Sequence, residues 1–153
     1  MQAQEFKQLL RETIDNQDNP FHPLVWISGT PKIGAGCYIG LFSELNAKGA
    51  EVVIGEGCDI GSFVAINVAD SHRRCIGLTD GNVYRDIHIG DHVFIGTHCA
   101  ILGGAVIGHH SVIAAGSIVR AVTIPPFSLV VGDSVKAEYY RAQYEQRHPA
   151  APK

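Results

Sequence analysis

Residues 67–88 concentrate the side chains of this chain that could do chemistry. His72 lies two residues after Asp70, and an imidazole can take up or release a proton near neutral pH. The segment also contains the arginines Arg73, Arg74 and Arg85. A guanidinium can bind a phosphate through two hydrogen bonds, although loop arginines are more often simply solvated. Because long loops on a rigid scaffold often carry functional groups, function is expected here.

The scaffold for this segment is a six-residue repeat of branched aliphatic residues. Six is a multiple of two, so every repeated side chain can point to the same face of an extended strand, which a helical period of 3.6 does not allow. The repeat predicts an all-β fold, a parallel β-helix of about five coils over residues 27–136 with an excursion at 67–88. The repeated positions are Ile27, Ile33, Ile39, Leu45, Ile54, Ile60, Ile66, Ile89, Ile95, Ile101, Ile107, Ile113, Val119 and Val131, with Pro125 interrupting the last series.

The interior of such a narrow prism is filled by its own side chains, so it offers no internal pocket. Cys37, Cys58 and Cys99 fall at small inward positions of the repeat, where a thiol packs as a compact apolar group. Cys75 falls in the excursion. These spacings favour neither a disulfide framework nor a Cys-x-x-Cys metal site.

The two ends of the chain read as short helices outside the repeat. Residues 1–26 comprise an amphipathic helix, with Phe6 and Leu9 on its apolar face, and a linker containing Pro20 and Pro23. The helix is expected to cover the open end of the first coil. Residues 137–153 are expected to form a second short helix and a tail.

Composition limits the classes of partner. The chain has 153 residues, 46% of them hydrophobic, which suits one domain, and a net charge of −3 gives no reason to expect nucleic acid. No run of 18 apolar residues is present, and Gln2–Arg11 is polar, so we expect neither membrane insertion nor a signal peptide. A cytoplasmic location is the default expectation.

Residues 87–136 contain motifs that match a known family. The most specific are Val93–His98 (VFIGTH), Ala115–Ser117 (AGS) and Ile124–Gly132 (IPPFSLVVG), together with the upstream loop histidine. With these motifs, residues 27–136 resemble the hexapeptide-repeat acyltransferases, particularly galactoside and maltose acetyltransferases and the sugar acetyltransferases of cell-surface polysaccharide synthesis, including O-antigen. The resemblance implies a left-handed β-helix, a homotrimer with active sites between subunits, and acetyl-CoA as donor.

The same resemblance implies roles for individual residues. His72 would be the general base that takes the proton of an acceptor hydroxyl, and the Thr97 amide would stabilise the oxyanion, with no metal and no acyl-enzyme. Asp70 could fix the tautomer of His72 or contact the acceptor. The expected acceptor-binding residues are Asn46, Asn67, Asp70 and Arg74, although the asparagines suit turns equally well. The expected donor-binding residues are Thr97, Ala115, Arg120 and Lys136.

Some features depart from the family pattern or leave alternatives open. Phe94 replaces a frequent Trp, and Val119–Ile124 is one residue longer than the family's usual V-T-K-D-I, which leaves the placement of Arg120 open. A carbonic anhydrase-like zinc protein would need a second histidine five residues after His98, where Gly103 stands. A non-catalytic trimeric scaffold is the other alternative. The acceptor, a sugar or a nucleotide sugar, and the choice between O- and N-acetylation stay open.

Overall fold

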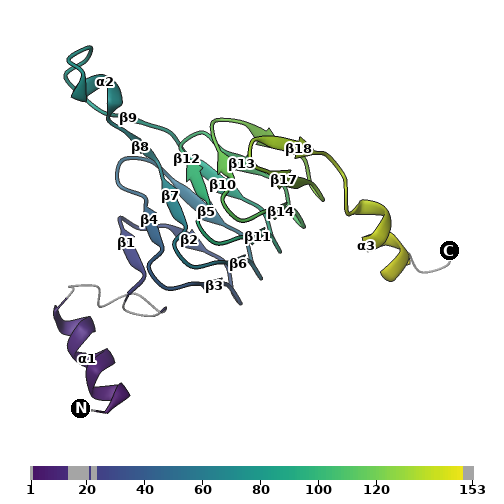
Figure 1. Cartoon of the computed structure of the whole chain (residues 1–153), viewed down its shortest axis with the longest axis horizontal. Helices are drawn as coiled ribbons and strands as arrows, with labels where there is room; N and C mark the ends of the chain where they lie inside the picture. The colour runs from purple at the N-terminus through teal and green to yellow at the C-terminus, as the bar shows by residue number, and fades with distance from the viewer. Residues whose placement is uncertain (1, 14–20, 22–23, 150–153) are drawn as a thin grey trace.

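The computed structural model describes residues 2–13, 21 and 24–149. Its main body is a column of short strands wound into three parallel sheets (Figure 1). The expected linker prolines, Pro20 and Pro23, and the last four residues of the tail lie outside the described residues. The helices are α1 (Ala3–Thr13), α2 (His72–Cys75) and α3 (Arg141–Arg147).

Each coil of the column contributes one strand to each of three sheets. Sheet A contains β1 (Trp26–Ser28), β4 (Glu44–Asn46), β7 (Ala65–Asn67), β12 (Ala100–Leu102) and β15 (Ile118–Val119). Sheet B contains β2 (Lys32–Ile33), β5 (Val52–Ile54), β10 (Ile87–Ile89), β13 (Val106–Ile107) and β16 (Thr123–Ile124). Sheet C contains β3 (Tyr38–Ile39), β6 (Asp59–Ile60), β11 (Phe94–Ile95), β14 (Val112–Ile113), β17 (Leu129–Val131) and β18 (Ser134–Lys136). Within these three sheets, as far as the described residues go, only β18 runs antiparallel, against β17.

The repeated aliphatic residues stack one above another inside the column. Ile54 lies between Ile33 and Ile89 in the register of sheet B, and every repeated residue from Ile39 to Val119 is buried. Burial raises the pKa of Cys58 to about 11 and also raises the pKa of Cys99, as expected for thiols that only fill the core. The predicted parallel β-helix of about five coils is therefore confirmed.

One predicted core position is wrong. Val131 is 49% exposed, whereas Val130 is buried and pairs with Ile113. The cause lies between β15 and β16, where the inward residues Val119 and Ile124 are five residues apart instead of the usual six. This missing residue shifts the last coil by one position, since neighbouring side chains of a strand point to opposite faces.

The three edges of the prism are named by the sheets they join. The A–B edge follows Asn46, Asn67 and Leu102 and carries the excursion. The B–C edge carries His92, His110 and Phe127, and the C–A edge carries Phe42, Phe63 and His98. All six of these ring residues have φ between 53° and 62°, the left-handed region that non-glycine residues seldom adopt.

The terminal helices differ in how they meet the column. Tyr144 of α3 packs on His110 and Phe127, with ring centroids 4.6 and 5.1 Å apart. On α1, Phe6 and Leu9 are each 49% exposed, so its role as a cap on the first coil stays a prediction. No described helix has both the length and the apolar character that crossing a bilayer requires.

Candidate active site

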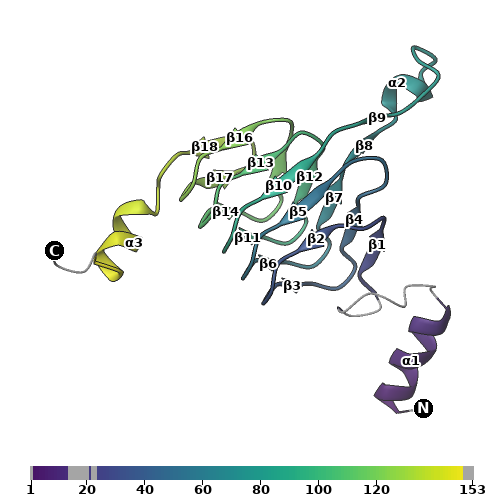
Figure 2. The same cartoon turned by 180° about the vertical axis from the view of Figure 1, so that it is seen from behind.

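The excursion forms an arm that projects from the A–B edge (Figures 1 and 2). Its base is a two-stranded antiparallel ladder of β8 (Ala69–Asp70) and β9 (Val83–Tyr84), continued by a hydrogen bond from the Arg85 N–H to the Val68 carbonyl at 3.1 Å. Between the strands, α2 leads to a tip where Ile76 and Leu78 are more than 60% exposed. The arm is therefore an ordered ladder with an apolar tip.

Asp70 and His72 meet at the point where β8 turns into α2. Asp70 Oδ1 lies 2.5 Å from His72 Nδ1 and also accepts the backbone N–H of His72 at 3.1 Å. A carboxylate only accepts, so Nδ1 carries the proton and Nε2 keeps a lone pair in the neutral ring. The hydrogen bond from His72 lowers the pKa of Asp70. This arrangement can present Nε2 as a base.

A cavity of about 330 Å³ lies at the foot of the arm, bordered by Asn67 and Asp70. Asn46 donates to Asn67 Oδ1 at 3.2 Å, and the same oxygen accepts the Ala69 N–H at 2.8 Å. Asn46 Oδ1 in turn accepts the Lys48 N–H at 3.1 Å. Both asparagines thus shape the backbone here, which was the alternative to their predicted acceptor contacts.

Thr97 and Ala115 lie on consecutive coils of the C–A edge and form a ledge. The Gly116 N–H donates to the Thr97 carbonyl at 2.9 Å, and a Cβ added to Gly96 would meet Ala115 N at 2.5 Å. Among the described residues, the backbone N–H groups of Thr97 and Ala115 have no acceptor. The Thr97–Ala115 ledge therefore presents two free donors, as an oxyanion and a pantetheine amide would need.

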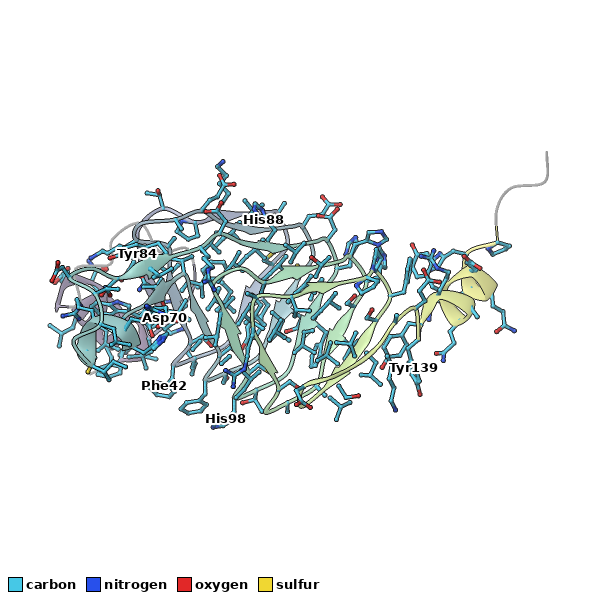
Figure 3. The ribbon with its side chains drawn as sticks, turned by 90° about the horizontal axis from the view of Figure 1, so that it is seen from above. Phe42, Asp70, Tyr84, His88, His98 and Tyr139 are labelled. Carbon is cyan, nitrogen blue, oxygen red and sulfur yellow. The ribbon has the colours of Figure 1, made fainter. Side chains whose placement is uncertain are left out.

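His98 has a fixed position beside this ledge. The Thr97 hydroxyl donates to the Ser62 carbonyl at 2.7 Å, so its oxygen must accept from His98 Nδ1, 2.9 Å away. The His98 ring stacks on Phe63 at 4.9 Å, and Phe63 stacks on Phe42 at 5.2 Å. Figure 3 shows Phe42 and His98 along one side of the prism, opposite His88. Sequence reasoning missed this stack of rings, although all three residues come three places after a repeated aliphatic residue.

One chain does not bring all the predicted site residues together. The arm with His72 leaves the A–B edge, whereas the Thr97–Ala115 ledge lies on the C–A edge. The predicted donor set also divides, because Arg120 borders the cavity at the A–B edge and Lys136 lies on β18 over the Tyr139 ring at 5.8 Å. Arg74 binds Asn82 within the arm at 2.7 Å. Arg120 thus lies at another edge of the column than the ledge, and donor binding by Arg120 and Lys136 stays a prediction.

The histidines on the B–C edge do not converge as a metal site. His109 Nδ1 and His110 Nδ1 are 2.9 Å apart, and aromatic rings surround them. Within the part of the chain that the structure describes, no three His, Cys, Asp or Glu side chains are arranged to hold one ion.

A family model matches the part of the chain that contains the Val93–His98 and Ala115–Ser117 motifs. Residues 86–121 match the model "Bacterial transferase hexapeptide (six repeats)". A 50-residue segment is 52% identical to "Putative acetyltransferase SACOL2570" of Staphylococcus aureus (strain COL), covering 33% of this chain and 25% of that protein. The chain thus matches only about a quarter of the length of this relative.

Solved structures extend the likeness over most of the chain. The hexapeptide-repeat containing acetyltransferase VCA0836 from Vibrio cholerae superposes with a TM-score of 0.62 at 27% identity, covering 89% of this chain and 79% of that one. A maltose O-acetyltransferase from Clostridium difficile 630 (TM-score 0.60, 21% identity, 86% and 82% covered) shares the fold. So does AntD, an N-acyltransferase from Bacillus cereus solved with dTDP and coenzyme A (TM-score 0.67, 19% identity, 82% and 74% covered). The chain carries a bacterial transferase hexapeptide-repeat segment and resembles the hexapeptide-repeat acetyltransferases, as its motifs predicted.

Proposed function

We propose that the chain is an acetyl-CoA-dependent acetyltransferase that acetylates a sugar or nucleotide sugar, with His72 as general base. The observation that carries this proposal is the Asp70–His72 contact, which leaves Nε2 free at an exposed position beside a cavity. The hexapeptide-repeat match and the acetyltransferase names of the relatives support acetyl transfer. AntD, crystallised with dTDP and coenzyme A, and the maltose acetyltransferase support a sugar acceptor.

In the proposed reaction, His72 Nε2 takes the acceptor proton as the acceptor oxygen or nitrogen attacks the thioester carbonyl. The tetrahedral oxyanion is stabilised by the Thr97 N–H, and it collapses with cleavage of the carbon–sulfur bond. The CoA thiolate then takes the proton from His72, which restores the neutral base. Acetyl transfer in this scheme is direct, so it uses no acyl-enzyme and no metal.

The separation of His72 and Thr97 within one chain makes a second copy part of the proposal. We place the arm of one copy against the C–A edge of the next, in a homotrimer. Ile76 and Leu78 of the arm are exposed, and so are the Phe42 and Phe63 rings that they would cover. Exposed Glu44 and Asp59 flank those rings, and Arg73 and Arg74 of the arm complement their charge.

A thiol-release screen tests the function directly. The protein is incubated with acetyl-CoA and a panel of neutral sugars, amino sugars and nucleotide sugars, and free CoA thiol is measured. Acceptor-dependent release, with the acetylated product identified by mass spectrometry, is the expected result. Absence of both CoA binding and thiol release across the panel would contradict the proposal and leave a scaffold.

A further inference from the structure

The cavity at the foot of the arm is bordered by two arginines from distant parts of the sequence. Arg85 lies just after β9, and Arg120 lies at the A–B edge just after β15. Gly103 and Gly104 leave room for the Arg85 side chain. A Cβ added to Gly103 would lie 3.2 Å from Arg85 Cβ, and a Cβ added to Gly104 would lie 3.4 Å from Arg85 Cδ. Arg85 therefore runs along this edge beside the corner that carries Arg120.

Neither arginine forms an ion pair in the described part of the chain, and the charge of Arg85 also helps to lower the pKa of Asp70. Other cations do pair there: Lys32 with Glu51 and Arg141 with Glu138. The single carboxylate on the cavity wall is Asp70, whose Oδ1 already holds His72. The cavity of about 330 Å³ is therefore bordered by two guanidinium groups and by one carboxylate that is already bound to His72, which leaves an excess of positive charge around it. Ligand pockets commonly have about this size.

We propose that this cavity binds the oxyanion group, phosphate or carboxylate, of a negatively charged acceptor. Arg85 and Arg120 are its cationic clamp, with the Asn67 amide beside them. Guanidinium groups hold such oxyanions through short, charge-assisted hydrogen bonds. Val68, Val83 and Leu102 supply an apolar wall for the carbon skeleton. This inference rests on the proposed acetyltransferase function and adds the charge class of its acceptor.

The position of the cavity assigns the anion to the acceptor rather than to CoA. Asp70 borders the cavity and contacts His72, so a group bound there lies next to the proposed base. The whole pantetheine arm separates the phosphates of CoA from the thioester that reacts at that base. An anion beside His72 therefore belongs to the molecule that His72 deprotonates. This reassigns Arg120 from the donor to the acceptor.

Isothermal titration calorimetry on the full chain tests the clamp with defined probes. The probes are inorganic phosphate, glucose 1-phosphate, glucuronate and the neutral methyl glucoside, with CoA titrated separately. We expect glucose 1-phosphate or glucuronate to bind at least tenfold more tightly than methyl glucoside, and the stronger of the two identifies the oxyanion. Arg85→Gln and Arg120→Gln should each weaken that probe about tenfold or more while changing CoA affinity less than threefold.

Arg147→Gln is the matched control, because Arg147 is exposed on α3 and does not border the cavity. It should leave binding of the charged probes unchanged. Equal binding of charged and neutral sugars would overturn the clamp, and so would an Arg120→Gln variant that loses CoA but keeps glucose 1-phosphate. Either result can occur in an active acetyltransferase. Conversely, charged probes bound through both arginines by a protein that binds no CoA would keep the anion site and overturn the proposed function.

Discussion

Two edges of the prism carry stacked rings, and only one of them is covered. On the B–C edge, Phe127 is 5% exposed beneath α3, with Arg141 over its ring at 4.7 Å. On the C–A edge, Phe42 and Phe63 are 56% and 50% exposed. A left-handed backbone costs a non-glycine residue roughly 1–2 kcal/mol, so glycine would be favoured at these corners unless the rings have contacts to make. The comparison shows that α3 covers the B–C stack, whereas the C–A stack, where we propose that a second copy docks, is exposed in the single chain.

The two stacks of rings also end differently. The B–C rings continue upward into Tyr144, whereas the C–A rings end at His98, with Gly116 at the equivalent corner of the next coil. A Cβ on Gly116 would have no neighbour within 4 Å. The sequence thus has a glycine at the level of the Thr97–Ala115 ledge, where an acyl donor would need open space.

The largest expected effect comes from removing the proposed base that the arm brings to the uncovered edge. His72→Ala should lower turnover by about 10²–10⁴ without changing the melting temperature, because the side chain is exposed and only proton transfer is lost. Steady-state thiol release measures the loss. Cys75→Ser, at the end of the same helix, is the control and should keep full activity. An His72→Ala enzyme with normal turnover would remove this residue from the mechanism.

The second prediction makes the uncovered edge more like the covered one. Gly116→Phe should fold normally, because Phe42, Phe63 and Phe127 occupy equivalent corners with φ near 60°. Its ring would stack over His98 across the ledge and weaken acetyl-CoA binding about tenfold or more, which calorimetry measures. Phe at one of the two B–C corner glycines of the described chain, Gly36→Phe, is the control that should leave donor binding intact. Unchanged affinity in Gly116→Phe would show that the donor does not use this ledge.

The third prediction is that removing a ring lowers folding stability at the B–C stack but weakens association between copies at the C–A stack. Phe127→Ala should lower the free energy of unfolding by about 2–4 kcal/mol, because it removes a buried ring and the support of α3. Phe63→Ala should change unfolding by less than about 0.5 kcal/mol in the separated chain, since the ring is half exposed. It should instead raise the dissociation constant between copies about tenfold, measured by sedimentation. If both variants lost the same free energy of unfolding and Phe63→Ala did not weaken association, the proposed difference between the two stacks would be contradicted.

The smallest expected effect is a pH dependence confined to the covered edge. The pKa of His110 is lowered by burial and by the charges of His109 and His92, against which Asp91 acts. A group with a lowered folded-state pKa contributes stability above its unfolded value, near 6.5, and this contribution is lost as the pH falls through the folded value. Protonation would also place a cation near His148 and Arg141.

The protection factors of the α3 amides, which remove the intrinsic pH dependence of hydrogen exchange, should therefore be lower at pH 5 than at pH 7.5. His110→Phe keeps a ring in the stack but cannot titrate, so its protection factors should change less between these conditions. The C–A edge should show no comparable change. An α3 that is equally protected at both pH values would contradict this coupling.

Sequence reasoning predicted the structure best in the regular coils, where each position repeats at a fixed spacing. The core positions before the last coil and the placement of Ala115 one coil beyond Thr97 follow from equal spacing in the repeat. The last coil was misassigned because a single missing residue after Val119 changes the face of every later side chain. The cavity was also missed, since Arg85 and Arg120 border it together only after the chain has wound two full coils past the arm. The roles of His72 and Thr97 remain predictions.

The most direct test of the central claim, a site shared by two copies, is complementation between His72→Ala and Gly116→Phe. Assayed at subsaturating acetyl-CoA, His72→Ala alone should be nearly inactive, and Gly116→Phe alone should keep about a tenth of normal activity or less. Co-expressed at equal levels, randomly mixed trimers should pair an intact arm with an intact ledge in about a quarter of their sites, so about a quarter of normal activity should return. A site built within one chain would leave every site of the mixture damaged, and a mixture as inactive as its parents would contradict the account.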